Sequence, residues 1–509
     1  MRNVTSMLLG GAAGLVAVTA AHPADLPVKA KPIEYVKICT LYGEGFFYIP
    51  GTDTCMKIGG YLRAEIDANA GGTFAPGLGP GGGNAAQHIW SYDRTSDTLV
   101  TRTRQLWTFD VRSQTEFGTL RSYSRTGIQW TTGDSIAAGS GAVAYIDRAF
   151  IQLGGFTIGK AVSFFDSYVY GIHSYQSSVL GSEGTAGNGT NMLAYTAQFG
   201  GGISATLASE DSFSRSRSIV NVNTPAFFSV NAQSPFSNGP PSSQAGFTHP
   251  DIVGNLRIDQ AWGNVGVSAA AHQANALYYG IGQASAGGGL AGLVTNGHPA
   301  DKWGYAAQVG GVLNVPWAPG DTFGVQLAYG VGALGYVDDG GQGSFAVFRG
   351  GNLALGFITD GVYGGANAGN GSALELTTGW AVTAGYEHYW TPALRTSLYG
   401  GYTAITYDQA ATSQICTGAG FAALGTGIGG FTPSSCTPNF ALWQVGSRTV
   451  WNPVKNLDVG LEVIYSRIQT GFGGNALVNA NVAQPTENFT VGDQSVWSGI
   501  FRVQRNFWL

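Results

Sequence analysis

Arginine is the residue type whose spacing in this chain points most clearly to a shared role. Six arginines in the first third of the sequence stand on the polar side of segments in which apolar and polar residues alternate. They are Arg63, Arg104, Arg112, Arg121, Arg125 and Arg148. A guanidinium stays charged and donates hydrogen bonds in a planar fork, so a wall of them helps to orient dipolar solutes and to filter ions. The chemistry that this pattern predicts is electrostatic selection, not the making or breaking of bonds.

Acidic residues in the same segments allow a second interpretation of these arginines. Ion pairs with them would stabilise the wall instead of selecting solutes. The candidates are Glu65, Asp67, Asp110, Glu116 and Asp147. The two roles are compatible, and both stay open at this point.

The sequence offers no pattern for catalysis, for a metal or for a cofactor. The seven histidines are never spaced as metal ligands, and the chain has neither a Gly-x-Ser-x-Gly motif nor a phosphate-binding glycine loop. We therefore expect no enzyme activity, no catalytic residue, no metal and no cofactor. With a net charge of −5 and 25 basic residues scattered without runs, nucleic acid is not an expected partner.

The alternating segments are the elements that must position the arginines. Sixteen of them, each about ten residues long, are separated by gaps that are by turns short and long. A bilayer satisfies no backbone hydrogen bonds, so strands of roughly 9–11 residues cross it only as a closed sheet with lipid outside and water inside. The segments are expected to begin near Lys57, Arg102, Thr119, Val143, Phe156, Met192, Ile203, Asp251, Val265, Trp303, Thr322, Trp380, Arg395, Phe440, Leu457 and Val496. The predicted fold is all-β: a 16-stranded antiparallel transmembrane β-barrel with short periplasmic turns and long external loops.

The third long loop, 159–191, is unusually aromatic for a loop in water. Its notable residues are Phe164, Phe165, Asp166, Tyr168, Tyr170 and Glu183. A loop folded into the lumen would bury the rings against the wall and present Asp166 toward the arginines, which would focus a transverse field across a constriction. The alternative is that 161–170 continues the fifth strand into a girdle of aromatic residues. The inward fold is the prediction.

Composition and the N-terminus divide the chain into three parts. Charged residues are only 11% of the chain, against roughly 25% in soluble domains, and no linker splits it. An apolar stretch behind a single basic residue predicts a signal peptide over 1–23, cleaved between 21 and 24. A periplasmic N-terminal segment (24–56) and the barrel (57–509) follow.

Four cysteines allow three pairings, and export favours their oxidation. Proximity in sequence favours Cys39 with Cys55 and Cys416 with Cys436. The second pair would staple a long loop and reduce its conformational entropy.

The N-terminal residues resemble the alphaproteobacterial outer-membrane porin family. The most specific matches are 35–39, 42–55 with both cysteines, and 57–63; a weaker one is 147–153 followed by 155–159. The resemblance implies a homotrimeric channel in the outer-membrane lipid for passive diffusion of small hydrophilic solutes and ions, with the third long loop as an eyelet. It also implies a basic wall that Arg104, Arg112, Arg121 and Arg125 match in type and approximate place. The chain departs from the family in ending Phe507-Trp508-Leu509, without a terminal aromatic residue.

The sequence therefore predicts a general-diffusion porin. One alternative is a channel specific for a sugar or an anion, with the loop aromatics as its binding site. Another is a plugged barrel that serves as an adhesin or a structural anchor.

Overall fold

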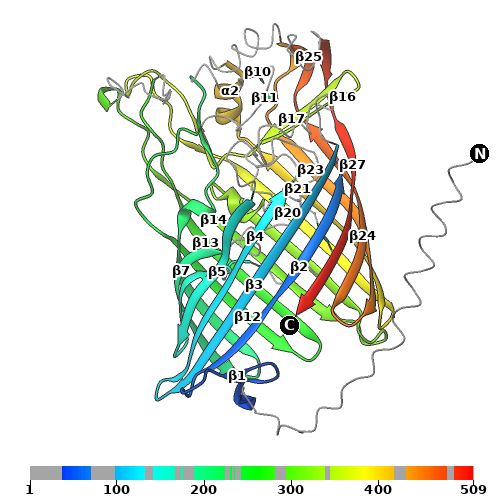
Figure 1. Ribbon diagram of the computed structural model, residues 1–509. Coiled ribbons are helices and arrows are strands. Elements are labelled where there is room, and N and C mark those ends of the chain that lie inside the picture. Colours follow the sequence, from blue (N-terminus) through cyan, green and yellow to red (C-terminus); the bar gives the residue numbers. More distant parts are fainter. Residues whose placement is uncertain are drawn as a thin grey trace, which may run out of the picture.

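The alternating segments form a closed antiparallel ring of strands (Figure 1). The computed structural model describes residues 37–69, 98–131, 142–166, 174–175, 189–223, 230–231, 234–235, 242–280, 294–338, 344–417, 431–478 and 487–507. The predicted signal peptide and the candidate loop residues Tyr168, Tyr170 and Glu183 lie outside these ranges.

The main sheet has seventeen strands, of which the two-residue β1 (Phe47–Tyr48) pairs only with the start of β2. The other sixteen make the barrel. In order around the ring they are β2 (Cys55–Ala68), β3 (Leu99–Thr115), β4 (Gly118–Thr131), β5 (Ala142–Leu153), β6 (Phe156–Ala161), β7 (Thr190–Gly200), β8 (Ile203–Glu210), β12 (Asp251–Gln260), β13 (Gly263–Ala274), β14 (Lys302–Asn314), β15 (Thr322–Val331), β20 (Thr378–Thr391), β21 (Leu394–Thr406), β23 (Phe440–Val454), β24 (Leu457–Thr470) and β27 (Gln494–Phe507). Each of the sixteen predicted starting points lies within three residues of an observed one.

The ring closes where the last strand, β27, pairs antiparallel with the first, β2. Gly60 faces Phe507 at the end of this ladder and has a φ of 142°. A Cβ at Gly60 would lie 2.0 Å from the backbone oxygen of Leu106 on β3. Only glycine permits this close approach, because it has no side chain and tolerates positive φ.

Side chains alternate between the two faces of the wall as predicted. On β15, Phe323, Leu327 and Tyr329 are 38–51% exposed and point outward, whereas Gln326 and Ala328 are buried on the inner face. An apolar outer face is what contact with lipid requires, and a polar inner face suits a lumen.

Seven short turns lie at one end of the barrel, and the described part of the N-terminal segment, residues 37–54, lies at the same end (Figure 1). This segment carries the 3₁₀ helix η1 (Thr40–Tyr42) and β1. The disulfide Cys39–Cys55 ties it to the first residue of β2. The first of the two predicted pairings is therefore confirmed.

The long loops at the opposite end carry secondary structure of their own. Their elements are η3 (Ser212–Ser214), β9 (Ile219–Asn221), β10 (Val230–Asn231), β11 (Ser234–Pro235), η4 (Val294–Asn296), η5 (Leu334–Tyr336), β16 (Ser344–Arg349), β17 (Asn352–Phe357), β18 (Gly361–Tyr363), β19 (Glu375–Leu376), α2 (Gln409–Thr417), β22 (Phe431–Ser435), β25 (Gly473–Val478) and β26 (Glu487–Val491). β16, β17, β26, β25 and β22 pair into a five-stranded sheet, and β19, β18 and β9 into a three-stranded one. No helix in these described ranges is long and apolar enough to span a membrane.

One hydrophobic cluster joins these loops to the outer part of the barrel wall. Loop residues such as Phe357, Ile415 and Phe489 are buried together with Leu442 on β23 and Ile468 on β24. The loops thus pack against the inner face near the mouth of β20–β27 and share one core with it.

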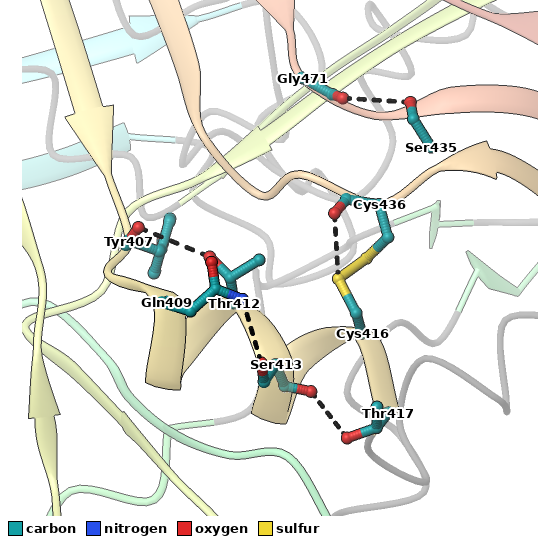
Figure 2. The surroundings of a disulfide bond; sticks show 9 residues. All are labelled: Tyr407, Gln409, Thr412, Ser413, Cys416, Thr417, Ser435, Cys436 and Gly471. Atoms are coloured by element: carbon teal, nitrogen blue, oxygen red, sulfur yellow. Dashed lines mark hydrogen bonds between the residues drawn. A yellow bond between two sulfur atoms is a disulfide. The ribbon is translucent and has the colours of Figure 1, made fainter.

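The helix α2 contributes Ala411 and Ile415 to this cluster, and a disulfide holds its C-terminal end (Figure 2). Asp408 accepts a hydrogen bond from the backbone N–H of Ala411 (2.7 Å), a typical N-cap contact. Near the other end Cys416 forms a disulfide with Cys436, which follows β22. The second predicted pairing is also confirmed.

Candidate functional site

The inner faces of β27, β2, β3, β4 and β5 form one strongly basic wall. Among the described residues of these strands, nine basic side chains and four acidic ones point inward. The basic ones are Lys57, Arg63, Arg102, Arg104, Arg112, Arg121, Arg125, Arg148 and Arg502, and the acidic ones are Glu65, Asp67, Asp110 and Asp147. Glu116, the fifth acidic candidate, is exposed in the turn after β3. The six arginines chosen from sequence therefore lie together on one wall.

Two further arginines of this wall, Arg102 and Arg502, were missed by the sequence reasoning although the alternation placed both on the inner face. They are buried on either side of Glu65. The Nε of Arg102 lies 3.3 Å from a Glu65 oxygen, and the Nε of Arg502 donates to the other oxygen at 2.6 Å. Arg102 also lies 3.6 Å from Asp67. These buried pairs fit the stabilising interpretation, because each charge has a partner where water is excluded.

A second group of ion pairs is partly open to the lumen. Arg112 and Arg121 both bind the carboxylate of Asp110, at 2.7 and 2.9 Å, and Arg125 lies 3.2 Å from Asp147. The three arginine side chains are 26%, 27% and 34% exposed. Both interpretations therefore hold here: the carboxylates stabilise the guanidinium groups, which remain accessible to a passing solute.

Arg63 and Arg104 face each other across β2 and β3 in the middle of the wall. The Nε of Arg63 donates to the Gln504 side chain at 2.7 Å, and that of Arg104 donates to Gln129 at 3.0 Å. Like charges directly opposite each other repel, so this row holds a local concentration of positive charge. It strengthens the attraction of the wall for anions.

A β-bulge in β5 adds the last basic residue to the wall. The register with β4 shifts between the pairs Arg125–Arg148 and Thr126–Ile146. Asp147 therefore has no residue opposite it on β4, and both Asp147 and Arg148 are buried. Bulges redirect side chains in this way, and strict alternation does not predict them.

The third long loop leaves the wall and enters the lumen. Strand β6 ends at Ala161 and residues 162–166 form no strand, so these described residues do not follow the alternative in which 161–170 continues the fifth strand. The backbone oxygen of Phe165 accepts a hydrogen bond from Gln308 on β14 (2.6 Å), and that of Phe164 accepts one from Ser268 on β13 (3.3 Å). The Phe165 ring is fully buried against Tyr336 of η5, with centroids 4.6 Å apart. We refer to residues 163–166 as the loop root.

Asp166 of the loop root has a partner that the sequence reasoning did not select. Its carboxylate pairs with Arg215, in the loop after β8, and both side chains are 1% exposed. Burial alone would lower the pKa of Arg215, but the Asp166 carboxylate and the neighbouring Tyr336 and Glu210 raise it above its ordinary value. Asp166 thus holds the loop root in place, and its burial does not fit a carboxylate open to the lumen.

The loop reaches another part of the wall at Ser174 and Tyr175, which we call the loop tip. The backbone N–H of Tyr175 donates to the Glu462 carboxylate on β24 at 2.5 Å. The guanidinium carbon of Arg502 on β27 lies 3.7 Å from the centroid of the Tyr175 ring, and that of Arg448 on β23 lies 5.1 Å from the same centroid. The loop therefore touches β13 and β14 at its root and β23, β24 and β27 at its tip, as the predicted inward fold requires.

Polar residues line a cavity of about 510 Å³ between the loop root and the short turns. Phe164 borders it, and its other lining side chains come from β4 to β12, among them Gln152, Thr206, Asn255 and Arg257. Among the described residues no group of histidine, cysteine, aspartate or glutamate is arranged to hold a metal ion. The arrangement as a whole is a polar passage with a charged wall and an inserted loop.

The sequence profile and the sequence relatives point to one family. The sequence profile described as the porin subfamily matches residues 25–500. Porin Omp2b of Brucella suis is 31% identical over 271 residues, which are 52% of this chain and 64% of that protein. Porin Omp2a of Brucella melitensis is 33% identical over 227 residues, 41% of this chain and 56% of that protein. The matched regions thus span between half and two thirds of the length of these relatives. Among solved structures, an anion-selective porin from Comamonas acidovorans has a TM-score of 0.45 and 8% identity, with 89% of this chain and 100% of that chain covered.

Proposed function

The chain belongs to the porin subfamily, and from this premise we propose that it forms a water-filled channel for the passive diffusion of small hydrophilic solutes and ions. It is a protein of the bacterial outer membrane. The observation that carries the proposal is the closed ring of sixteen strands with an apolar outer face and a charged, polar inner one. Sixteen strands leave room for an aqueous passage, whereas eight would be filled by side chains.

We propose further that the channel prefers anions. Nine basic side chains against four acidic ones give the wall of β27 and β2–β5 a positive excess. Elsewhere in the lumen, Arg448 pairs with Glu387 and Arg257 with Asp259. A wall with a net positive charge raises the local concentration of anions and lowers that of cations.

Family membership also supports a homotrimer in outer-membrane lipid, with a role as a channel and not as an enzyme. Chemical cross-linking of the detergent-solubilised chain tests the assembly. A ladder that stops at three copies is expected, and a ladder that stops at one copy would contradict the trimer.

Recording from planar bilayers tests the channel itself. We expect steady, ohmic conductance, and a reversal potential of the sign for anion preference in a salt gradient. Arg121→Ala and Arg125→Ala should each reduce this preference. Asp166→Ala should act mainly through the position of the loop, because Asp166 is buried against Arg215.

The same recordings separate the rival functions. A saturable block by one sugar or anion would identify a solute-specific channel, although Phe165, the most buried ring of the loop root, offers no open surface for such a site. A barrel plugged for adhesion or anchoring would give no steady conductance. That outcome would point to the hydrophobic cluster at the mouth as the plug.

A further inference from the structure

Tyr175 occupies an unusual position for a residue of a loop. Its ring lies between two guanidinium groups of the wall, with Arg502 at 3.7 Å and Arg448 at 5.1 Å from the centroid. Both arginines are themselves held by carboxylates, Arg502 by Glu65 (2.6 Å) and Arg448 by Glu387 (2.5 Å). The cations are therefore in place before the ring arrives, so a buried cation–π contact costs little reorganisation.

The wall opposite Tyr175 has no side chain where the ring fits. Gly460 is buried on the inner face of β24, two residues before Glu462 on the same face. A Cβ at Gly460 would lie 2.3 Å from the Tyr175 hydroxyl oxygen and 3.0 Å from two ring carbons. Glycine weakens a strand, and in a strand interior it often marks a close approach by another group. Here the approaching group is the loop tip.

We propose that Gly460 and Tyr175 form a latch that sets the open cross-section of the channel. The notch at Gly460 admits the ring, the two arginines hold it, and the Glu462 carboxylate fixes the backbone of the loop tip. The inference rests on the proposed diffusion function, and it adds the residues that determine which sizes of solute pass. Tyr175 is in this view a positioning residue, and it acts on solutes only through the loop.

Two variants disturb the latch from opposite sides. Tyr175→Ala removes the ring, and Gly460→Ala fills the notch. Loss of the cation–π contacts should reduce the ratio of docked to undocked loop tips by roughly tenfold. Each variant should then show a second, larger conductance level and admit larger neutral sugars in a liposome-swelling assay. Tyr175→Phe keeps the ring and should resemble the unmodified protein.

The double variant is the decisive combination. Once the ring is absent, a methyl group at position 460 has nothing to displace, so Gly460→Ala should have no further effect in the Tyr175→Ala background. Additive effects would overturn the latch, because they would show that Gly460 acts through the wall alone.

Gly127→Ala is the matched control. A Cβ at Gly127 would lie 2.3 Å from the hydroxyl oxygen of Tyr145, but Tyr145 belongs to strand β5 and not to the loop. The same Cβ would lie 2.8 Å from the backbone oxygen of Gln105, so this variant introduces at least as severe a collision on the inner face without touching the loop tip. The size limit for sugars should not rise.

Hydrogen exchange of the Tyr175 amide gives a readout that does not depend on conduction. In the detergent-solubilised full chain, this amide should exchange faster in Tyr175→Ala and in Gly460→Ala than in the unmodified protein. Its exchange rate should be unchanged in Gly127→Ala. Faster exchange with a heat-resistant barrel supports the docking of Tyr175 at Gly460 even if no variant conducts; in that case the proposed channel fails, and with it the role of the latch in sizing solutes, but the docking contact does not. Unchanged exchange in both latch variants would overturn it.

Discussion

Asp110 offers a direct test of how charge on the basic wall governs ion preference. Its carboxylate binds Arg112 and Arg121 at 2.7 and 2.9 Å. Asp110→Asn raises the positive excess of the wall by one unit charge, and Arg121→Gln at the neighbouring position lowers it by one. The two variants change charge by equal and opposite amounts at nearly one point of the lumen, so each is the control of the other.

The size of the effect follows from Coulomb's law. A unit charge about 10 Å from a passing ion contributes roughly 0.4 kcal/mol in water. Screening over a Debye length of about 10 Å at 0.1 M salt reduces this to roughly 0.15 kcal/mol. The effect on a cation has the opposite sign to that on an anion. The anion-to-cation permeability ratio should therefore change by about 1.7-fold at 0.1 M salt, upward in Asp110→Asn and downward in Arg121→Gln.

The assay is the reversal potential of single channels across a tenfold gradient of potassium chloride. The shifts should shrink when both solutions are made more concentrated, since salt screens the wall. Shifts of the same sign in the two variants, or none in either, would refute the assignment of this wall as the one that ions pass. A heat-resistant band on gels confirms that each variant still forms the barrel.

Three further outcomes are expected. Phe165→Ala should destabilise the loop root by about 3–5 kcal/mol, because the Phe165 ring is fully buried. The less firmly held loop should increase the noise of the open-channel current, and noise equal to that of the unmodified protein would contradict the role of the loop root as an anchor. Asp321, in the turn before β15, is desolvated, but hydrogen bonds from Tyr386, His388 (2.7 Å) and the Tyr389 N–H (2.9 Å) outweigh this and lower its pKa. Its ionised carboxylate therefore stabilises the barrel at pH values above the pKa of an unfolded aspartate, and this stabilisation is lost as the pH falls through the lowered pKa. In Asp321→Asn the thermal midpoint of unfolding should therefore fall less steeply on acidification than in the unmodified protein. An equally steep fall would contradict this role. Replacing Cys416 and Cys436 by serine should reduce the stability of the folded loop by about 3 kcal/mol, because the disulfide closes a separation of 20 residues. The expected result is faster proteolysis between α2 and β22, and the control is the chain in which Cys39 and Cys55 are replaced instead.

The strands could be located from sequence because the bilayer imposes a local rule. Each residue of a spanning strand faces either lipid or lumen, so the chain records its position at every second residue. The inner placement of Arg104, Arg112, Arg121 and Arg125 followed from that rule. Arg102 and Arg502 also fall on the inner face by this rule, but Arg102 stands at the predicted start of its strand and Arg502 stands between Phe501 and Val503, where a single charge is easily overlooked.

Features that depend on distant or aperiodic contacts could not be found in this way. The bulge at Asp147 breaks the alternation without a sequence mark. Arg215, the partner of Asp166, lies 49 residues away in a loop that no periodicity constrains. The external loops were expected to be long and polar, but their small sheets and shared hydrophobic cluster depend on packing between loops that are far apart in the chain.

The inserted loop has a mechanical consequence for the ring. Its root is fixed to β13 and β14 and its tip to β23, β24 and β27, and the eight Cα–Cα steps from Asp166 to Ser174 span at most about 29 Å. A hoop of strands flattens easily into an oval, since hydrogen-bonded neighbours bend against each other at little cost. The number of residues between the two anchors limits how far these arcs of the ring can move apart, and so limits that flattening. Cutting the chain between the two anchors should therefore soften the cylinder as well as widen its bore.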